Sequence, residues 1–286
     1  MKRFATLAAI LVAAATVLAT VPGCSKDDNT TTPPVTTTKL YVQLKANAQY
    51  TFKRQDLDSN SAPITASART YNVVLKGNGG LIQGAYNDWF YRIGTDTQSN
   101  EKDTLLIRTN TGSNSGTSFT QDIQVYGFAH EVLQSFSDLV TLQFGGTPPN
   151  LPGPNWDVVS MFQDQTGAAY AVGKEWVIGS SSGESLSFDI GGFPITATVI
   201  IRGKLESVSD KLMMGSTEVK AWKTTITITA TLPLGSPIVM TMSLWFSDNP
   251  DGQVKVLQNS SKFIVPIVGT TLPIPGEIQE LQSYLE

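Results

Sequence analysis

The chain has 286 residues, a hydrophobic content of 41% and a formal net charge of −4 at pH 7. That content is enough for a packed core, and the length allows one large β domain or two smaller ones. A mildly acidic chain without a cluster of lysine and arginine argues against a nucleic-acid partner. The only cysteine is Cys24 and the only histidine is His130, so the chain after Cys24 offers no disulfide and no site with several imidazole or thiolate ligands.

Residues 1–23 have the pattern of a secretory signal peptide. Lys2 and Arg3 give a short positive start, and residues 4–20 are apolar, rich in alanine and free of charge. A spanning helix needs ~20 strongly apolar residues, so this shorter run favours export over a transmembrane anchor. The apolar run ends at Pro22-Gly23, and Cys24 follows directly.

Val21-Pro22-Gly23-Cys24 resembles the lipobox of bacterial lipoproteins. The resemblance implies cleavage before Cys24 and a diacylglyceryl group joined to the thiol through a thioether. Several acyl chains give stable membrane residence, at ~0.8 kcal/mol per buried methylene. Ser25 fits sorting to the outer membrane. Lys26-Asp27-Asp28 is similar to the export tag of surface lipoproteins in the Bacteroidetes group, and whether the protein faces the periplasm or the outside stays open.

The mature chain is predicted to divide into a tether and a folded part. Residues 24–38 are almost entirely polar, with several threonines and two prolines, which is typical of a disordered, fairly extended segment. We expect this lipid-anchored tether to hold a β-rich domain, residues 39–286, away from the membrane. A run rich in proline and glycine at residues 145–155 is a candidate boundary inside that domain.

From residue 39 onward, short runs of alternating apolar and polar residues predict strands separated by turn signals. The aromatic run at residues 89–93 is expected to pair with residues 104–108 across a polar loop. Asp248-Asn249-Pro250-Asp251-Gly252 predicts a hairpin turn. The other predicted strands lie at residues 40–44, 50–52, 71–75, 156–162, 170–178, 186–190, 196–208, 224–232, 238–246 and 254–257.

One stretch has helical spacing. Phe128, Val132, Phe136, Leu139 and Val140 could share the face of a short helix within residues 128–144. Because strands follow one another without long helices between them, the chain is predicted to be mainly β, with one or two short helices. The expected architecture is an antiparallel sheet that forms a curved half-barrel or a sandwich.

Residues 214–258 carry a second resemblance. Gly215-Ser216 leads into a long threonine-rich strand, and Leu244-Trp245-Phe246 precedes the glycine turn and a strand that contains Val254-Lys255. This order looks like the last third of uncharacterised periplasmic and lipoprotein families with a curved, incomplete β-barrel, similar to the LolA and LolB lipoprotein carriers. The resemblance implies a concave sheet that holds an acyl chain or another apolar ligand, and it brings no catalytic residues.

Met240, Met242, Trp245 and Phe246 are the candidate ligand-binding residues. They belong to one predicted strand, and methionine adapts its shape to irregular apolar surfaces. Barrels and half-barrels often leave an apolar cavity, which these four side chains would line. The alternative is that they pack in the core, as aromatic side chains on strands commonly do.

Two short motifs suggest chemistry that the rest of the chain does not support. Gly179-Ser180-Ser181-Ser182-Gly183 matches a nucleophile elbow, but an alternating strand follows it and His130 precedes it. Asp56-Leu57-Asp58-Ser59-Asn60 begins like a calcium loop, but Ser61 and Ser67 stand where that loop needs glycine and glutamate. We therefore expect no catalytic residue, no metal site and no cofactor.

The sequence thus predicts a non-enzymatic outer-membrane lipoprotein that binds a lipid or another apolar ligand. Its partners would be the membrane, through acylated Cys24, and an apolar small molecule, with no nucleic acid. The alternative is a structural or adhesive surface β-domain without a small-molecule ligand. The tether and the many threonines fit that alternative equally well.

Overall fold

The computed structural model describes residues 45–77, 90–110, 122–126, 158–160, 172–180, 186–190, 193–231, 237–248, 251–264 and 271–285. Most of them belong to strands, which form a 13-stranded sheet and a separate two-stranded sheet with antiparallel pairing throughout. Within these ranges the helical structure is a single 3-10 turn, η1 (Thr65–Ser67), and no helix could cross a membrane. The predicted mainly β, antiparallel fold is confirmed.

The strands vary greatly in length, and the longest lie in the second half of the chain. β9 and β10 together form a hairpin far longer than a typical strand pair of 5–6 residues each. The strands are β1 (Gln49–Leu57), β2 (Arg69–Lys76), β3 (Phe90–Asp96), β4 (Lys102–Asn110), β5 (Asp122–Tyr126), β6 (Val158–Ser160), β7 (Glu175–Ser180), β8 (Leu186–Ile190), β9 (Phe193–Met214), β10 (Thr217–Thr231), β11 (Ile238–Asp248), β12 (Asp251–Gln258), β13 (Ser261–Ile264), β14 (Thr271–Ile274) and β15 (Gly276–Leu285).

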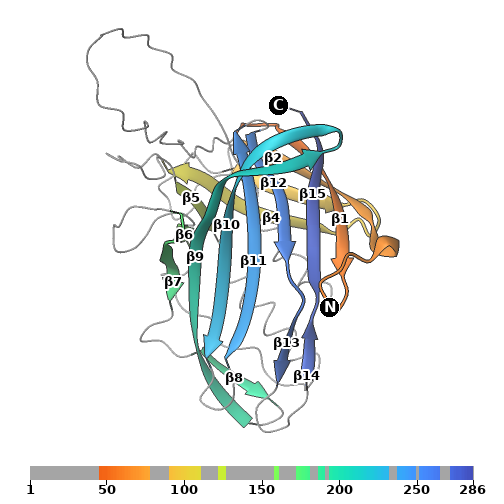
Figure 1. The fold of residues 1–286 in the computed structure, drawn as a ribbon. Coiled ribbons are helices and arrows are strands. Elements are labelled where there is room, and N and C mark those ends of the chain that lie inside the picture. The colour runs from red at the N-terminus through yellow and green to blue at the C-terminus, as the bar shows by residue number, and fades with distance from the viewer. Residues whose placement is uncertain are drawn as a thin grey trace, which may run out of the picture.

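The main sheet is one curved surface with the order β6-β5-β4-β3-β2-β1-β15-β12-β11-β10-β9-β7, and β8 pairs with β9. It curls so strongly that its two edge strands, β6 and β7, approach each other (Figure 1). No ladder joins these edges among the described residues, so the sheet is curved but not closed. β15 lies between β1 and β12 and therefore connects the part built from β1–β6 to the part built from β7–β12.

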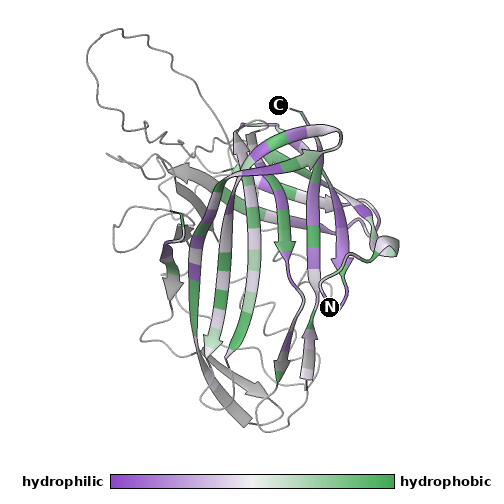
Figure 2. Cartoon of the chain, in the orientation of Figure 1, coloured by the Kyte–Doolittle hydropathy of each residue, from purple (hydrophilic) through white to green (hydrophobic). Residues whose placement is uncertain are grey.

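One face of the sheet is buried along most of its width, and we call it the inner face. On β10, Ile226 and Ile228 alternate with Thr225 and Thr227, which puts the isoleucines on the inner face and the threonines on the outer face. Isoleucine and threonine are both β-branched and favour the extended backbone. Figure 2 shows hydrophobic residues recurring along β9 to β11, whereas β1 and β15 are more hydrophilic.

The tip of the β9–β10 hairpin bends over the upper end of the outer face in the orientation of Figure 1. The register of the hairpin shifts at residues 221–224, and such bulges bend a strand and increase its twist. A Cβ added to Gly215 at the tip would lie 4.0 Å from the carbonyl oxygen of Gln282 in β15. The hairpin tip therefore reaches across to β15.

Several local predictions can be compared with this fold. The predicted pairing of residues 89–93 with 104–108 is confirmed, because Phe90 pairs with Ile107 and Arg92 with Leu105. The predicted hairpin before Gly252 is also confirmed by the pairing of Asp248 with Asp251. The signal segment, the tether, the predicted helix at 128–144 and the run at 145–155 lie outside the described residues. Strands on both sides of that run belong to the same sheet.

Candidate ligand site on the inner face of the sheet

The structure separates the four predicted ligand-binding residues. Met240, Met242 and Phe246 of β11 share the inner face, whereas Trp245 points to the outer face because successive side chains alternate along a strand. Trp245 therefore does not share a face with the other three, and ligand binding by Met240, Met242 and Phe246 stays a prediction. Met240, Met242 and Phe246 are 8%, 3% and 0% exposed, so the structure covers the three that do share a face.

Trp245 is buried on the outer face by the bend of the β9–β10 hairpin. Its indole Nε1 donates a hydrogen bond of 2.8 Å to Oδ2 of Asp210 on β9. Its cross-strand neighbours Lys223 and Lys255 place their ammonium groups 5.1 and 5.6 Å from the ring centroid, within the range of a cation–π interaction. Trp245 thus fastens the hairpin to the sheet.

An apolar wall covers the inner face of β9, β10 and β11. In register across these strands, Ile201 lies beside Ile228 and Met240, and Gly203 lies beside Ile226 and Met242. The ring of Trp176 from β7 covers Gly203, where an added Cβ would lie 2.4 Å from Cε2 of the ring. Other buried members of the wall are Val199, Leu205, Ala230, Ile238, Leu244 and Phe246.

A charged cluster occupies the inner face of β1, β2, β3 and β15. Arg54 donates from Nε and Nη2 to Oε2 of Glu277, each at 2.6 Å. Arg69 donates from Nε to Oδ2 of Asp96 at 2.7 Å and from Nη2 to Oδ1 of Asp56 at 2.9 Å. The side chains of Arg54, Asp96 and Glu277 are only 4–6% exposed, whereas that of Asp56 is 48% exposed. The cluster therefore runs from the protein interior to the solvent.

Local turns hold the acids of the cluster in position. After β3, Oδ1 of Asp96 accepts backbone N–H groups of Gln98 and Ser99, at 2.9 and 3.2 Å, and this leaves Oδ2 for Arg69. Such side-chain-to-backbone turns are typical of aspartate. On the other side, the hydroxyl of Ser67 in η1 accepts the backbone N–H of Asp56 at 2.8 Å.

A second charged group lies beside the first and shares Tyr71 with it. Nη1 of Arg92 donates to Oδ1 of Asp103 at 2.9 Å, and Nη2 donates to the Tyr71 hydroxyl at 3.1 Å. That hydroxyl in turn donates to Oδ2 of Asp103. The guanidinium of Arg54 lies 5.1 Å from the centroid of the same ring. Gly94 lies below the hydroxyl, because an added Cβ would come within 1.8 Å of it.

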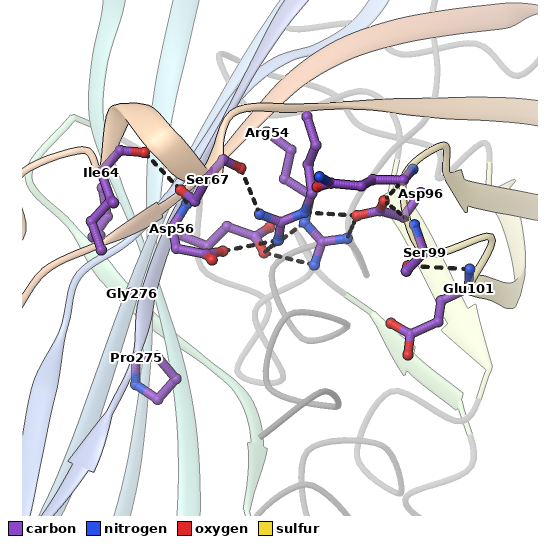
Figure 3. Close-up of a pocket in the computed structure, with 13 residues that line it drawn as sticks. Arg54, Asp56, Ile64, Ser67, Asp96, Ser99, Glu101, Pro275 and Gly276 are labelled. Atoms are coloured by element: carbon purple, nitrogen blue, oxygen red, sulfur yellow. Dashed lines mark hydrogen bonds and ion pairs between the residues drawn. The ribbon is translucent and has the colours of Figure 1, made fainter.

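The first cluster borders an open pocket of about 530 Å³. Figure 3 shows Arg54 and Asp96 facing each other, with Asp56 and Ser67 on the side of η1. The turn between β3 and β4 and the start of β15 complete the walls. The lining residues are Arg54, Asp56, Leu57, Ile64, Ser67, Arg69, Asp96, Gln98, Ser99, Glu101, Pro275, Gly276 and Glu277.

Burial and ion pairing shift the pKa values of the acids in this pocket in opposite directions. Burial raises the pKa of Glu277 above its usual value, and the attraction of Arg54 opposes this only in part. Burial also acts to raise the pKa of Asp96, but hydrogen bonds from Ser99, Gln98 and Arg69 outweigh it and lower that pKa. Burial and the neighbouring Asp103 raise the pKa of the Tyr71 hydroxyl. The tyrosine therefore stays neutral and donates a hydrogen bond to Asp103.

Replacing Asp96 with asparagine is expected to reduce the loss of stability in acid. Because the pKa of Asp96 is lowered from 3.8, its carboxylate stabilises the fold above that pH, and the contribution disappears as the pH falls through the folded value. Glu277 has the opposite effect, since its raised pKa makes stability fall as the pH rises above 4.5. Asp96→Asn should flatten the acid limb of the unfolding free energy in urea titrations, whereas Glu218→Gln, at a 56% exposed side chain, should not. An unchanged acid limb in Asp96→Asn would contradict this assignment.

The charged pocket is the part of the inner face that the sequence reasoning missed. Arg54 and Arg69 are in phase with the apolar residues Phe52 and Tyr71 of their own strands. That phase is the signal that could have identified them as inward-facing.

Of the two motifs that suggested chemistry, the acidic stretch at residues 56–60 is fully described by the structure and the serine motif only in part. Oδ1 of Asp58 accepts backbone N–H groups of Asn60 and Ala62, at 2.8 and 2.9 Å, so the acidic stretch forms a tight turn. Asp56 of the same stretch pairs with Arg69, and no cluster of three potential metal ligands occurs in the described ranges. Of the serine motif, Gly179 and Ser180 end β7, and the rest lies outside the described residues, as does His130.

No protein-family model matches the chain, and neither does any curated protein or solved structure.

Proposed function

We propose that the protein is a non-enzymatic binding module of the bacterial envelope that holds a lipid or another largely apolar ligand inside the curved sheet. In this proposal Cys24 carries the acyl chains that anchor the protein to the outer membrane. The folded part then presents its inner face to the ligand.

The observation that carries the proposal is the apolar wall on β9, β10 and β11. It is continuous across three strands in register, and it contains Met240 and Met242 beside Ile226 and Ile228. Unbranched methionine side chains change rotamer easily and can make room for ligands of irregular shape. Ligand sites of this kind are mostly apolar with a few placed polar groups, and the charged pocket on β1–β3 supplies such groups on the same face.

A structural or adhesive role remains the second candidate, because one observation favours it. The wall is already covered, with Met242 only 3% exposed and Phe246 completely buried and stacked on Trp222 at a centroid distance of 5.8 Å. A core that is permanently filled needs no ligand. The two candidates therefore differ in whether the wall opens for an apolar molecule.

Replacing Met242 with glutamine is expected to lower the amount of apolar molecule that copurifies with the protein by about ten-fold, because a buried amide costs about 1–3 kcal/mol. The protein is purified and extracted with organic solvent, and the extract is analysed by mass spectrometry. Val239→Gln is the matched control, because Val239 lies on the same strand, faces outward and is 45% exposed. A clean extract from wild type, with no binding of a fluorescent fatty-acid probe, would exclude the ligand and favour the structural role.

A further inference from the structure

Three buried side chains at the upper end of the inner face carry polar atoms without partners. The side chains are those of Trp222, Thr224 and Gln253. Within the described residues, their unpaired atoms are Nε1 of Trp222, Oγ1 of Thr224, and both Oε1 and Nε2 of Gln253. The three residues are 4%, 0% and 0% exposed. Water outside the protein therefore does not satisfy them.

The sheet register brings these side chains to one region. Trp222 of β10 pairs with Phe246 of β11, which pairs with Gln253 of β12, so the three lie in one row. Thr224 lies two residues further along β10 and shares the inner face with Trp222. At a strand spacing of about 4.8 Å, the backbones of Trp222 and Gln253 are about 10 Å apart. Together the side chains offer hydrogen-bond donors on both β10 and β12, with acceptors among them.

The side chains that lie between these polar groups do not satisfy them, and Gln279 of β15, beside Val256, has a buried Oε1 that is also unpaired among the described residues. The neighbours between them on the inner face are Phe246, Leu244 and Val256, which offer no side-chain hydrogen bond. A buried donor or acceptor that stays unpaired costs about 1–3 kcal/mol. Native proteins pair the great majority of buried polar groups with protein atoms, water or ligand, so these unpaired atoms need an explanation.

We propose that this polar station, formed by Trp222, Thr224 and Gln253, binds an uncharged hydrogen-bonding group, such as a hydroxyl, ester or amide, of a largely apolar ligand. The inference rests on the proposed function and specifies its ligand class. The apolar part of the molecule lies along the wall that continues down β10 and β11 from Thr224 to Ile228.

The surroundings select against a charged group at the polar station. All three of its side chains are neutral, and the nearest charged residues of β10 and β12 in the sequence, Lys223 and Lys255, face outward beside Trp245. A carboxylate at the station would be desolvated without a counter-charge, which is far more costly than burying a hydroxyl that is hydrogen-bonded. The arginines of β1 and β2 are paired with their own acids.

The test compares three probes of equal chain length on the delipidated full chain. Binding of 1-dodecanol, dodecane and dodecanoate is measured by displacement of N-phenyl-1-naphthylamine fluorescence. Wild type is expected to bind dodecanol about ten-fold more tightly than the other two. Thr224→Val and Gln253→Leu, singly and together, should remove that preference, whereas Thr225→Val makes the same chemical change on the outer face of β10 and should retain it.

The possible results distinguish a failure of this inference from a failure of the proposed function. Equal binding of dodecanol and dodecane, or a preference that survives in the double variant, shows that Thr224 and Gln253 do not bind the hydroxyl, and the inference is overturned while the apolar site stands. No displacement by any probe, together with a clean extract from the purified protein, overturns the proposed function and this inference with it. Thermal unfolding checks that each variant is folded. We expect the ligand-free Thr224→Val variant to be at least as stable as wild type, because it removes an unpaired buried hydroxyl.

Discussion

Glu277→Ala is expected to lower the free energy of unfolding by about 3–5 kcal/mol, the usual cost of removing one partner of a buried ion pair. The guanidinium of Arg54 would lose both of its hydrogen bonds of 2.6 Å to this carboxylate while its side chain stays 6% exposed. Arg69, 3.5 Å from the same oxygen, would lose part of its compensation as well. Urea denaturation followed by circular dichroism measures the loss.

Glu280→Ala is the matched control for this prediction, because Glu280 belongs to the same strand and also pairs with a cation, Lys255, at 2.8 Å. Its side chain is 37% exposed, so the loss should stay below about 1 kcal/mol. A double replacement, Arg54→Met with Glu277→Leu, should recover much of the stability, since it removes both charges together. If Glu277→Ala and Glu280→Ala lose the same amount, the ion pair does not have the assigned role.

Trp176→Ala is expected to cost about 3–5 kcal/mol, because it removes a 3% exposed indole from the apolar wall and leaves a cavity above Gly203. The reverse change, Gly203→Ala, should cost about 1–3 kcal/mol through overpacking, because the new methyl group would meet the ring at 2.4 Å. Both losses are measured as shifts of the urea midpoint at constant slope.

The two changes are expected to be strongly non-additive. In the double variant Trp176→Ala with Gly203→Ala, the methyl group occupies space that the indole has left, so the combined loss should be smaller than the sum of the two. Val177→Ala is the control, because Val177 is the neighbour of Trp176 on β7 and faces the other side of the sheet. Additive losses would show that Gly203 does not provide the space for the tryptophan ring.

Local patterns in the sequence predicted the fold class because a strand and a tight hairpin are determined by neighbouring residues. The turn before Gly252 and the pairing of β3 with β4 are of this kind. The pairing of β1 with β15 is not, because Arg54 and Glu277 are 223 residues apart in the sequence. No local signal identifies a partner at that distance.

The candidate site was predicted only in part, and the reasons are physical. The alternation along β11 already places Trp245 opposite Met240 and Met242, so the four residues could have been divided from the sequence alone. The unpaired atoms of Trp222, Thr224 and Gln253 could not, because their lack of partners depends on what the neighbouring strands bring beside them. Arg54 and Glu277 were missed because charged residues are assumed to face water unless a partner is visible.

The position of β15 between β1 and β12 also has a consequence for how the protein reaches its native state. Neither half of the sheet can complete its hydrogen bonding before residues 276–285 are present, so β1 and β12 keep unpaired edges until β15 has been made. Unpaired strand edges can pair with other chains. Arg54 of β1 and Glu277 of β15 are 223 residues apart in the sequence, and a loop of that length closes slowly. Chaperones that shield such edges should therefore raise the yield of folded protein, and an added peptide with the sequence of β15 should lower it by pairing with β1 or β12.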